Sequence, residues 1–173
     1  MATNYERAFA ERPEVYAAWV ALREAVRARL DPRRYELVTL AAAQRLRSSY
    51  CSLAHGRILA ERWDDPVAAI AADRHGAAAS GPGAALSPVD VAVMDLAEKV
   101  VADAAAIEEA DRQPLRDLGL SDDEIMDVVL AASIRCFFSK ALDALGVLPD
   151  AEYRELPADL QAVLVVGRPI AEA

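Results

Sequence analysis

Apolar residues recur at every third or fourth position along most of this chain, which is the spacing that places them on one face of an α-helix. The first such stretch carries its apolar side chains at Val15, Tyr16, Trp19, Leu22, Val26 and Leu30. Proline, glycine and helix-capping residues divide the pattern into about seven predicted helices, at 13–30, 34–47, 49–63, 66–74, 88–103, 108–118 and 122–145. No segment shows the alternation of apolar and polar residues that is typical of a strand. The pattern predicts an all-α protein.

The last predicted helix, 122–145, has the clearest boundaries. Ser121 and Glu124 form a capping box at its start, and Gly146 is suited to end it. Its apolar side is expected to comprise Ile125, Val128, Val129, Ala132, Phe137, Leu142 and Leu145. Cys136 stands beside two phenylalanines and is expected in the core.

Three segments lie outside the periodic pattern. Residues 1–12 are expected to form an extended or poorly ordered arm. Residues 76–87, rich in glycine and alanine, are expected to be a flexible lid or a simple connection, and His75 is expected to cap the helix before them. The tail, 149–173, contains three prolines and is expected to wrap the surface or a partner subunit.

Composition narrows the class of protein. A chain of 173 residues is most simply one domain, 1–173, with a core at about 10–150 and a C-terminal tail at 150–173. The net charge of −9 and the pI near 4.7 argue against nucleic acid and against an anionic membrane surface as partners. We expect a cytoplasmic protein, because the sequence shows no signal peptide and no apolar run of membrane-spanning length.

The candidate chemistry is a carboxylate, a thiol and an imidazole at Glu36, Cys51 and His55. Cys51 and His55 are four residues apart, so on a helix they lie on one face. If a preceding serine caps this helix, Cys51 lies in its first turn, where free N–H groups and the helix dipole favour the thiolate. His55 can also take the proton, and Glu36 is the candidate to orient the imidazole. Direct contact between them requires a bent or offset helix pair, or a bridging water.

Each of these residues also has a structural interpretation. Cys51 is alternatively a small buried hydrophobe, His55 a core histidine and Glu36 a surface carboxylate. Ser48 is most simply a helix cap, and alternatively a contact of the oxidised thiol. Tyr50 either packs or lines the pocket. We expect no metal and no cofactor, because the chain has two cysteines, two histidines and no paired C-x-x-C motif.

The spacing of these residues resembles a family motif. Alkylhydroperoxidase D-like proteins of the carboxymuconolactone decarboxylase superfamily carry Glu, eleven residues, Cys, two residues, Cys, three residues and His. This chain has Glu36, Ser48, Cys51 and His55 at those positions. The helical run before Glu36 is also similar, as are the segments LSPVDVAVMDLAEKV and LGLSDDEIMDVVLAASIRCFFSKALDALGV. The resemblance therefore covers roughly residues 10–150. It looks like the subgroup labelled uncharacterised peroxidase-related enzymes.

The resemblance implies an AhpD-like helical bundle, a homo-oligomer (dimer, trimer or hexamer) and thiol-based peroxidase chemistry. The catalytic roles carry over to Cys51, His55 and Glu36. Ser48 stands where the family has its first cysteine, so the disulfide of the two-cysteine motif cannot form. An external thiol reductant, or a cysteine of another protein or subunit, must then restore Cys51.

Three hypotheses about function remain open. The first is an antioxidant thiol peroxidase that reduces a hydroperoxide through Cys51, with His55 and Glu36 as a proton relay. The second is a lyase or isomerase of small organic acids, in which His55 and Glu36 do acid–base work and Cys51 is a bystander. The third is a non-catalytic helical oligomer whose pocket binds a ligand or a partner.

Overall fold

The computed structural model describes residues 2–78 and 85–172, which form ten α-helices and two short 3-10 helices. The helices are α1 (Asn4–Ala8), α2 (Pro13–Arg27), α3 (Pro32–Arg45), α4 (Ser49–Trp63), α5 (Val67–Ala72), α6 (Arg74–Ala78), α7 (Pro88–Asp103), η1 (Ala104–Ala106), α8 (Glu109–Asp117), α9 (Asp122–Ala144), η2 (Ala151–Glu155) and α10 (Ala158–Leu164). The described part of the chain contains no strand, so the predicted all-α fold is confirmed. The expected number of helices was too low, because α1, α6 and α10 were not foreseen.

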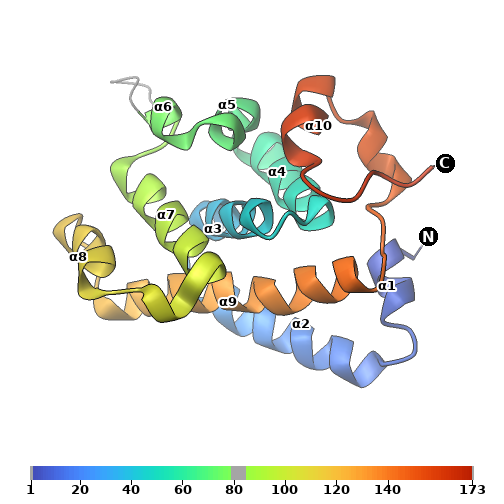
Figure 1. Cartoon of the computed structure of the whole chain (residues 1–173), viewed down its shortest axis with the longest axis horizontal. Coiled ribbons are helices and arrows are strands. Elements are labelled where there is room, and N and C mark those ends of the chain that lie inside the picture. The colour runs from blue at the N-terminus through green and yellow to red at the C-terminus, as the bar shows by residue number, and fades with distance from the viewer. Residues whose placement is uncertain (1, 79–84, 173) are drawn as a thin grey trace.

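Helix α3 is the centre of the fold. It packs against α4, α7 and α9, and every residue from Tyr35 to Ala43 is buried. Figure 1 shows α3 enclosed by α4, α7 and α9. The long α9 crosses the molecule, and α2 packs on the side of α9 that is opposite to α3. The small side chains of three consecutive alanines, 41–43, allow neighbouring helices to approach closely on several sides. The carboxylate of Glu36 is therefore carried into the interior.

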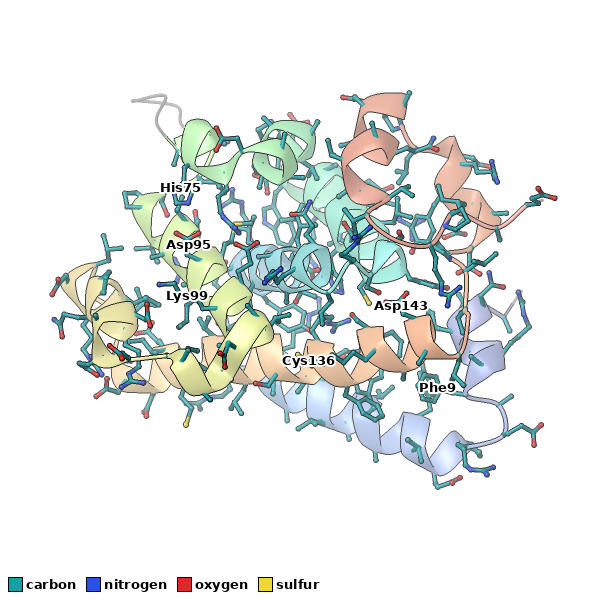
Figure 2. The ribbon with its side chains drawn as sticks, in the orientation of Figure 1. Phe9, His75, Asp95, Lys99, Cys136 and Asp143 are labelled. Carbon is teal, nitrogen blue, oxygen red and sulfur yellow. The ribbon has the colours of Figure 1, made fainter. Side chains whose placement is uncertain are left out.

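The first residues of the chain form a helix, so the expected extended arm is wrong. Thr3 and Glu6 make a capping box that starts α1, and this threonine-x-x-glutamate signal is present in the sequence. Phe9 is buried after α1 and stacks on Phe138 of α9, with ring centroids 5.8 Å apart. Figure 2 shows Phe9 between the end of α9 and the start of α2. Aromatic packing fixes this segment.

The C-terminal tail covers the protein's own helices. After η2, α10 packs against α4 and α5, and Leu164 is fully buried. The amide of Gly167 donates a hydrogen bond to Ser49 Oγ at 2.8 Å, and a Cβ at Gly167 would lie 2.0 Å from the carbonyl oxygen of Arg47. The tail therefore lies directly on the turn that begins α4.

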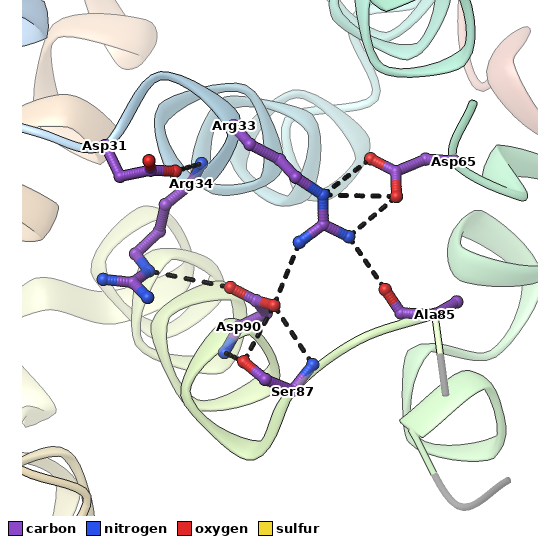
Figure 3. A network of polar contacts seen from close by, with 7 residues as sticks. All are labelled: Asp31, Arg33, Arg34, Asp65, Ala85, Ser87 and Asp90. Carbon is purple, nitrogen blue, oxygen red and sulfur yellow. Dashed lines mark hydrogen bonds and ion pairs between the residues drawn. The ribbon is translucent and has the colours of Figure 1, made fainter. Parts of the chain in front are cut away.

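A partly buried polar network joins α3 to the segments around it (Figure 3). Arg33 makes a forked ion pair with Asp65, a second ion pair with Asp90 at 3.1 Å and a hydrogen bond to the carbonyl of Ala85. Asp90 also accepts the hydrogen bonds of Ser87 in the capping box that starts α7. Burial alone would raise the pKa of Asp90, but the hydrogen bonds from Ser87 and the charge of Arg33 lower it below its ordinary value.

Helix α9 buries a different face from the one expected at its C-terminal half. Ile125, Val128, Ala132 and Leu142 are buried as predicted. Phe137 and Leu145 are 48% and 65% exposed, because Phe138 takes the buried position instead. Cys136 is only partly buried, so its expected place in the core is wrong.

Two further expectations concern the region after α5. His75 lies within α6 rather than at the end of a helix, and its Nε2 is 3.4 Å from Asp95 Oδ1. Figure 2 shows the two side chains facing each other. The predicted flexible segment 76–87 falls largely on residues 79–84, which lie outside the described residues. Within the described ranges, no helix is both long and apolar enough to cross a membrane.

Candidate active site

Helix α4 begins after a sharp turn and places Cys51 near its start. Arg47 has a φ of 57°, and the predicted boundaries of the helix, Ser49 to Trp63, are confirmed. Ser48 occupies the N-cap position, but its side chain makes no capping hydrogen bond. Cys51 is therefore the third residue of α4, where the unpaired N–H groups of the first turn favour a negative charge.

His55 and Glu36 are in direct contact through a hydrogen bond between His55 Nδ1 and a carboxylate oxygen of Glu36. Glu36 is buried and His55 is mostly buried, with 3% and 12% of their side-chain surfaces exposed. Helices α3 and α4 pack against each other, and Figure 1 shows α4 inclined to α3. No bridging water is needed, since the two long side chains span the remaining distance.

The electrostatics of this pair favour a neutral imidazole. Burial lowers the pKa of His55 below its ordinary value, although the charge and hydrogen bond of Glu36 oppose this. Burial acts to raise the pKa of Glu36, but the interaction with His55 outweighs it, so that this pKa is lowered. An ionised carboxylate only accepts hydrogen bonds, so Nδ1 carries the hydrogen and Nε2 keeps a free lone pair. His55 is therefore arranged as a base.

The sulfur of Cys51 lies against polar groups of α9. The residue is 2% exposed. Ser139 Oγ donates a hydrogen bond to Cys51 Sγ at 3.2 Å, and Arg135 Nη1 lies 3.8 Å from the same sulfur. Arg135 Nη2 is also 3.4 Å from the hydroxyl of Tyr35. The sulfur thus has two hydrogen-bond donors, one of them charged.

A cavity of about 250 Å³ opens beside Cys51 and His55, which both form part of its wall. Five aromatic rings also line it, from Tyr5, Trp19, Tyr50, Phe138 and Tyr153. The sulfur is therefore not enclosed by hydrocarbon alone, and the thiol and the imidazole border the same cavity.

The two remaining predicted contacts lie in different places. Tyr50 lines the cavity, and its hydroxyl donates a hydrogen bond to Asp150. Burial, together with that hydrogen bond, raises the pKa of Tyr50. Ser48 is fully buried and lies outside the cavity wall.

Sequence reasoning missed Arg135 and Ser139, although a signal was present. Val128, Ala132 and Leu142 were assigned to the apolar side of their helix, and helical spacing places positions 135 and 139 on that same side. A charged residue in the middle of an apolar helix face is seldom buried without a partner. Its position alone therefore marks it as a candidate site residue.

Cys136 follows Arg135, so its side chain leaves α9 about 100° around the helix axis from the side chain that reaches the sulfur of Cys51. Both cysteines are free. Within the described residues, no three His, Cys, Asp or Glu side chains are grouped so as to hold a metal ion.

The fold is that of a known class of protein. A crystal structure described as an alkylhydroperoxidase AhpD core, an uncharacterized peroxidase-related protein from Ralstonia eutropha JMP134, matches with a TM-score of 0.75 at 21% identity, covering 97% of this chain and 84% of that one. An uncharacterized peroxidase-related protein from Silicibacter sp. TM1040 matches with a TM-score of 0.78 at 24% identity, covering 90% of this chain and 80% of that one. The protein thus has an AhpD-like fold.

The sequence itself points to the same group. Residues 13–93 match the carboxymuconolactone decarboxylase family, and this range includes Glu36, Cys51 and His55. No curated protein matches the chain. The predicted resemblance to AhpD-like proteins of the carboxymuconolactone decarboxylase superfamily is confirmed. These matches show the fold and the similarity to this family.

Proposed function

We propose that this protein is a thiol-dependent peroxidase in which Cys51 reduces a hydroperoxide with the help of His55 and Glu36. The observation that carries the proposal is the shared cavity wall: the thiol and the imidazole border one space, and Glu36 holds the imidazole with Nε2 free. A nucleophile, a base and a group that orients the base are the parts that covalent catalysis requires.

The reaction step balances with these groups alone. His55 takes the proton of the Cys51 thiol, and the sulfur donates an electron pair to the terminal oxygen of the hydroperoxide. The S–O bond forms as the O–O bond breaks, and the imidazolium returns its proton to the departing alkoxide. The sulfur is oxidised to a sulfenic acid, and the hydroperoxide is reduced to an alcohol.

Recycling of the sulfenic acid requires a thiol from outside the motif. Ser48 cannot form a disulfide, and Cys136 lies on another face of α9. A first external thiol condenses with the sulfenic acid and releases water, and a second reduces the mixed disulfide. Each turnover thus consumes one hydroperoxide and two thiols, and yields an alcohol, water and a disulfide.

The test measures consumption of an organic hydroperoxide in the presence of a dithiol reductant. We expect activity in the wild type and in Cys136→Ser, and its loss in Cys51→Ser. Equal rates in the wild type and Cys51→Ser refute the proposal, provided that circular dichroism shows both proteins folded.

The contact between His55 and Glu36 also supports a second candidate function. A buried carboxylate–imidazole pair beside a cavity is suited to proton transfer on a small organic acid, without any role for the sulfur. Cys51→Ser separates the two candidates, because a lyase or isomerase keeps its activity in this variant and a thiol peroxidase does not.

A further inference from the structure

The guanidinium of Arg135 is a buried charge without a carboxylate partner. The residue is 2% exposed, and within the described residues no Asp or Glu oxygen lies within 4.0 Å of it. Its Nε has no hydrogen-bond partner in that same part of the chain. The guanidinium carbon lies 5.9 Å from the ring of Trp19 and 5.8 Å from that of Phe138. Because burial of an unpaired charge is costly, such a group indicates a missing anion.

The sulfur of Cys51 is in the place where that anion would lie. Arg135 Nη1 is 3.8 Å from Sγ, and Ser139 Oγ donates to the same sulfur at 3.2 Å. Both donors come from one face of α9, since they are four residues apart. A neutral thiol is a weak acceptor and gains little from two donors, whereas a thiolate gains from both.

The other ionisable groups around the sulfur do not replace Arg135. They include Tyr35 and Glu36 of α3, His55 of α4 and Tyr153 of η2. Arg23 and Arg57 line the same cavity, and among the described residues neither is bonded to the sulfur. Glu36 is negative and already bonded to His55, and burial lowers the pKa of this imidazole. Burial raises the pKa of Tyr153, so its hydroxyl stays neutral. Arg135 is the positive group in contact with the sulfur within the described part of the chain.

We propose that Arg135 is the counter-ion of a Cys51 thiolate, with Ser139 as the second donor, and that the sulfur is ionised before any hydroperoxide binds. This inference deepens the proposed peroxidase function and rests on Cys51 being the reacting atom of that function. Arg135 is then a positioning residue, because it acts through the sulfur.

If Cys51 is already a thiolate, the proton that the departing oxygen receives comes from the hydroperoxide and not from the thiol. The thiolate donates its electron pair to the terminal oxygen, the S–O bond forms and the O–O bond breaks. The hydroperoxide's own proton passes from the terminal oxygen to Nε2 of the neutral His55, and from there to the departing oxygen. The products are a sulfenate at Cys51 and an alcohol, so that atoms, charge and electrons balance without a proton from the thiol.

The experiment titrates the thiolate by its ultraviolet absorbance across pH in the reduced full-length protein. Four proteins are compared: the wild type, Arg135→Met, Arg135→Lys and, as a matched control, Arg112→Met on the surface of α8. The spectrum of the same protein carrying Cys51→Ser is subtracted from each, so that only Cys51 contributes. The alkylation rate of Cys51 at neutral pH is measured in parallel.

We expect a Cys51-dependent thiolate signal at neutral pH in the wild type and in Arg112→Met. Arg135→Met is expected to reduce the signal and the alkylation rate at least about 10-fold, since it removes a unit charge in contact with the sulfur. Arg135→Lys is expected to restore part of the thiolate signal and part of the alkylation rate, because lysine keeps the positive charge but lacks the forked N–H donors of the guanidinium.

Two results overturn the inference. One is an unchanged titration in Arg135→Met. The other is a wild type without a Cys51-dependent signal at neutral pH, which needs no variant to fold. Hydroperoxide consumption is measured separately. If the thiolate signal depends on Arg135 but the protein reduces no hydroperoxide, the proposed function is contradicted and the inference about Arg135 is not. A protein that reduces hydroperoxide through Cys51 but keeps its titration in Arg135→Met contradicts the inference alone.

Discussion

Replacing Glu36 by glutamine isolates the role of the carboxylate that holds His55. The side chain keeps its size, and its amide oxygen can still accept the N–H of Nδ1, so the main change is the loss of one buried negative charge. Hydrogen bonds to charged groups contribute about 1.5–3 kcal/mol, and about 1.4 kcal/mol corresponds to a factor of ten. Because the imidazolium loses this support, the rate of Cys51 oxidation is expected to fall by about 10- to 100-fold.

The assay follows the first oxidation of Cys51 by a hydroperoxide in a single turnover, so that recycling does not contribute. The pKa of His55, which burial already lowers, is expected to fall further in Glu36→Gln. NMR can follow it, since the chain has two histidines. Glu61→Gln, on the exposed side of α4, makes the same charge change and is expected to leave both readouts unchanged. A wild-type oxidation rate in a folded Glu36→Gln protein refutes the role assigned to the carboxylate.

Three further predictions concern stability, each measured by denaturant unfolding unless stated otherwise. Arg33→Met is expected to cost about 3 kcal/mol, because it leaves the carboxylate of Asp65 unpaired and takes one of two arginines from Asp90. The loss of unfolding free energy in Arg33→Met is largest above the unfolded pKa of about 3.9, and it shrinks as the pH falls through the lowered pKa of Asp90. An equal loss in acid contradicts the ion pairs of this network. Gly167→Ala is expected to cost about 1–3 kcal/mol by forcing a Cβ onto the carbonyl of Arg47, and faster hydrogen exchange confined to the tail and the start of α4 checks the cause. Phe9→Ala is expected to cost about 3 kcal/mol, whereas a neutral effect would mean that α1 does not pack on α9.

The sequence predicted those parts of the fold that depend on local chemistry. The helix from Ser49 to Trp63 and the start of α9 at the capping box of Ser121 follow from caps and periodicity, which act over a few residues. The capping box of Thr3 in α1 was equally readable but was overlooked. The buried face of α9 was partly wrong, because the choice between Phe137 and Phe138 depends on aromatic partners from distant segments.

In the candidate site, too, the features set by local spacing were predictable and those set by tertiary packing were not. Cys51 and His55 lie one helical turn apart, so their common cavity wall was accessible from spacing. The contact of Glu36 with His55 depends on how α4 inclines to α3, which no local pattern specifies. Arg135 reaches the sulfur from a helix 84 residues further along the chain, and only the tertiary fold brings it there. The catalytic roles, the reductant and the homo-oligomer stay predictions.

The most direct test of the central claim is mass spectrometry of the peptides after a brief pulse of organic hydroperoxide, with a reagent present that traps sulfenic acids. The proposed function predicts that the peptide containing Cys51 gains the trapped adduct first, and that the peptide containing Cys136 stays unmodified at the same time. Oxidation that begins at Cys136, or a Cys51 peptide that stays unmodified while the hydroperoxide is consumed, would contradict it.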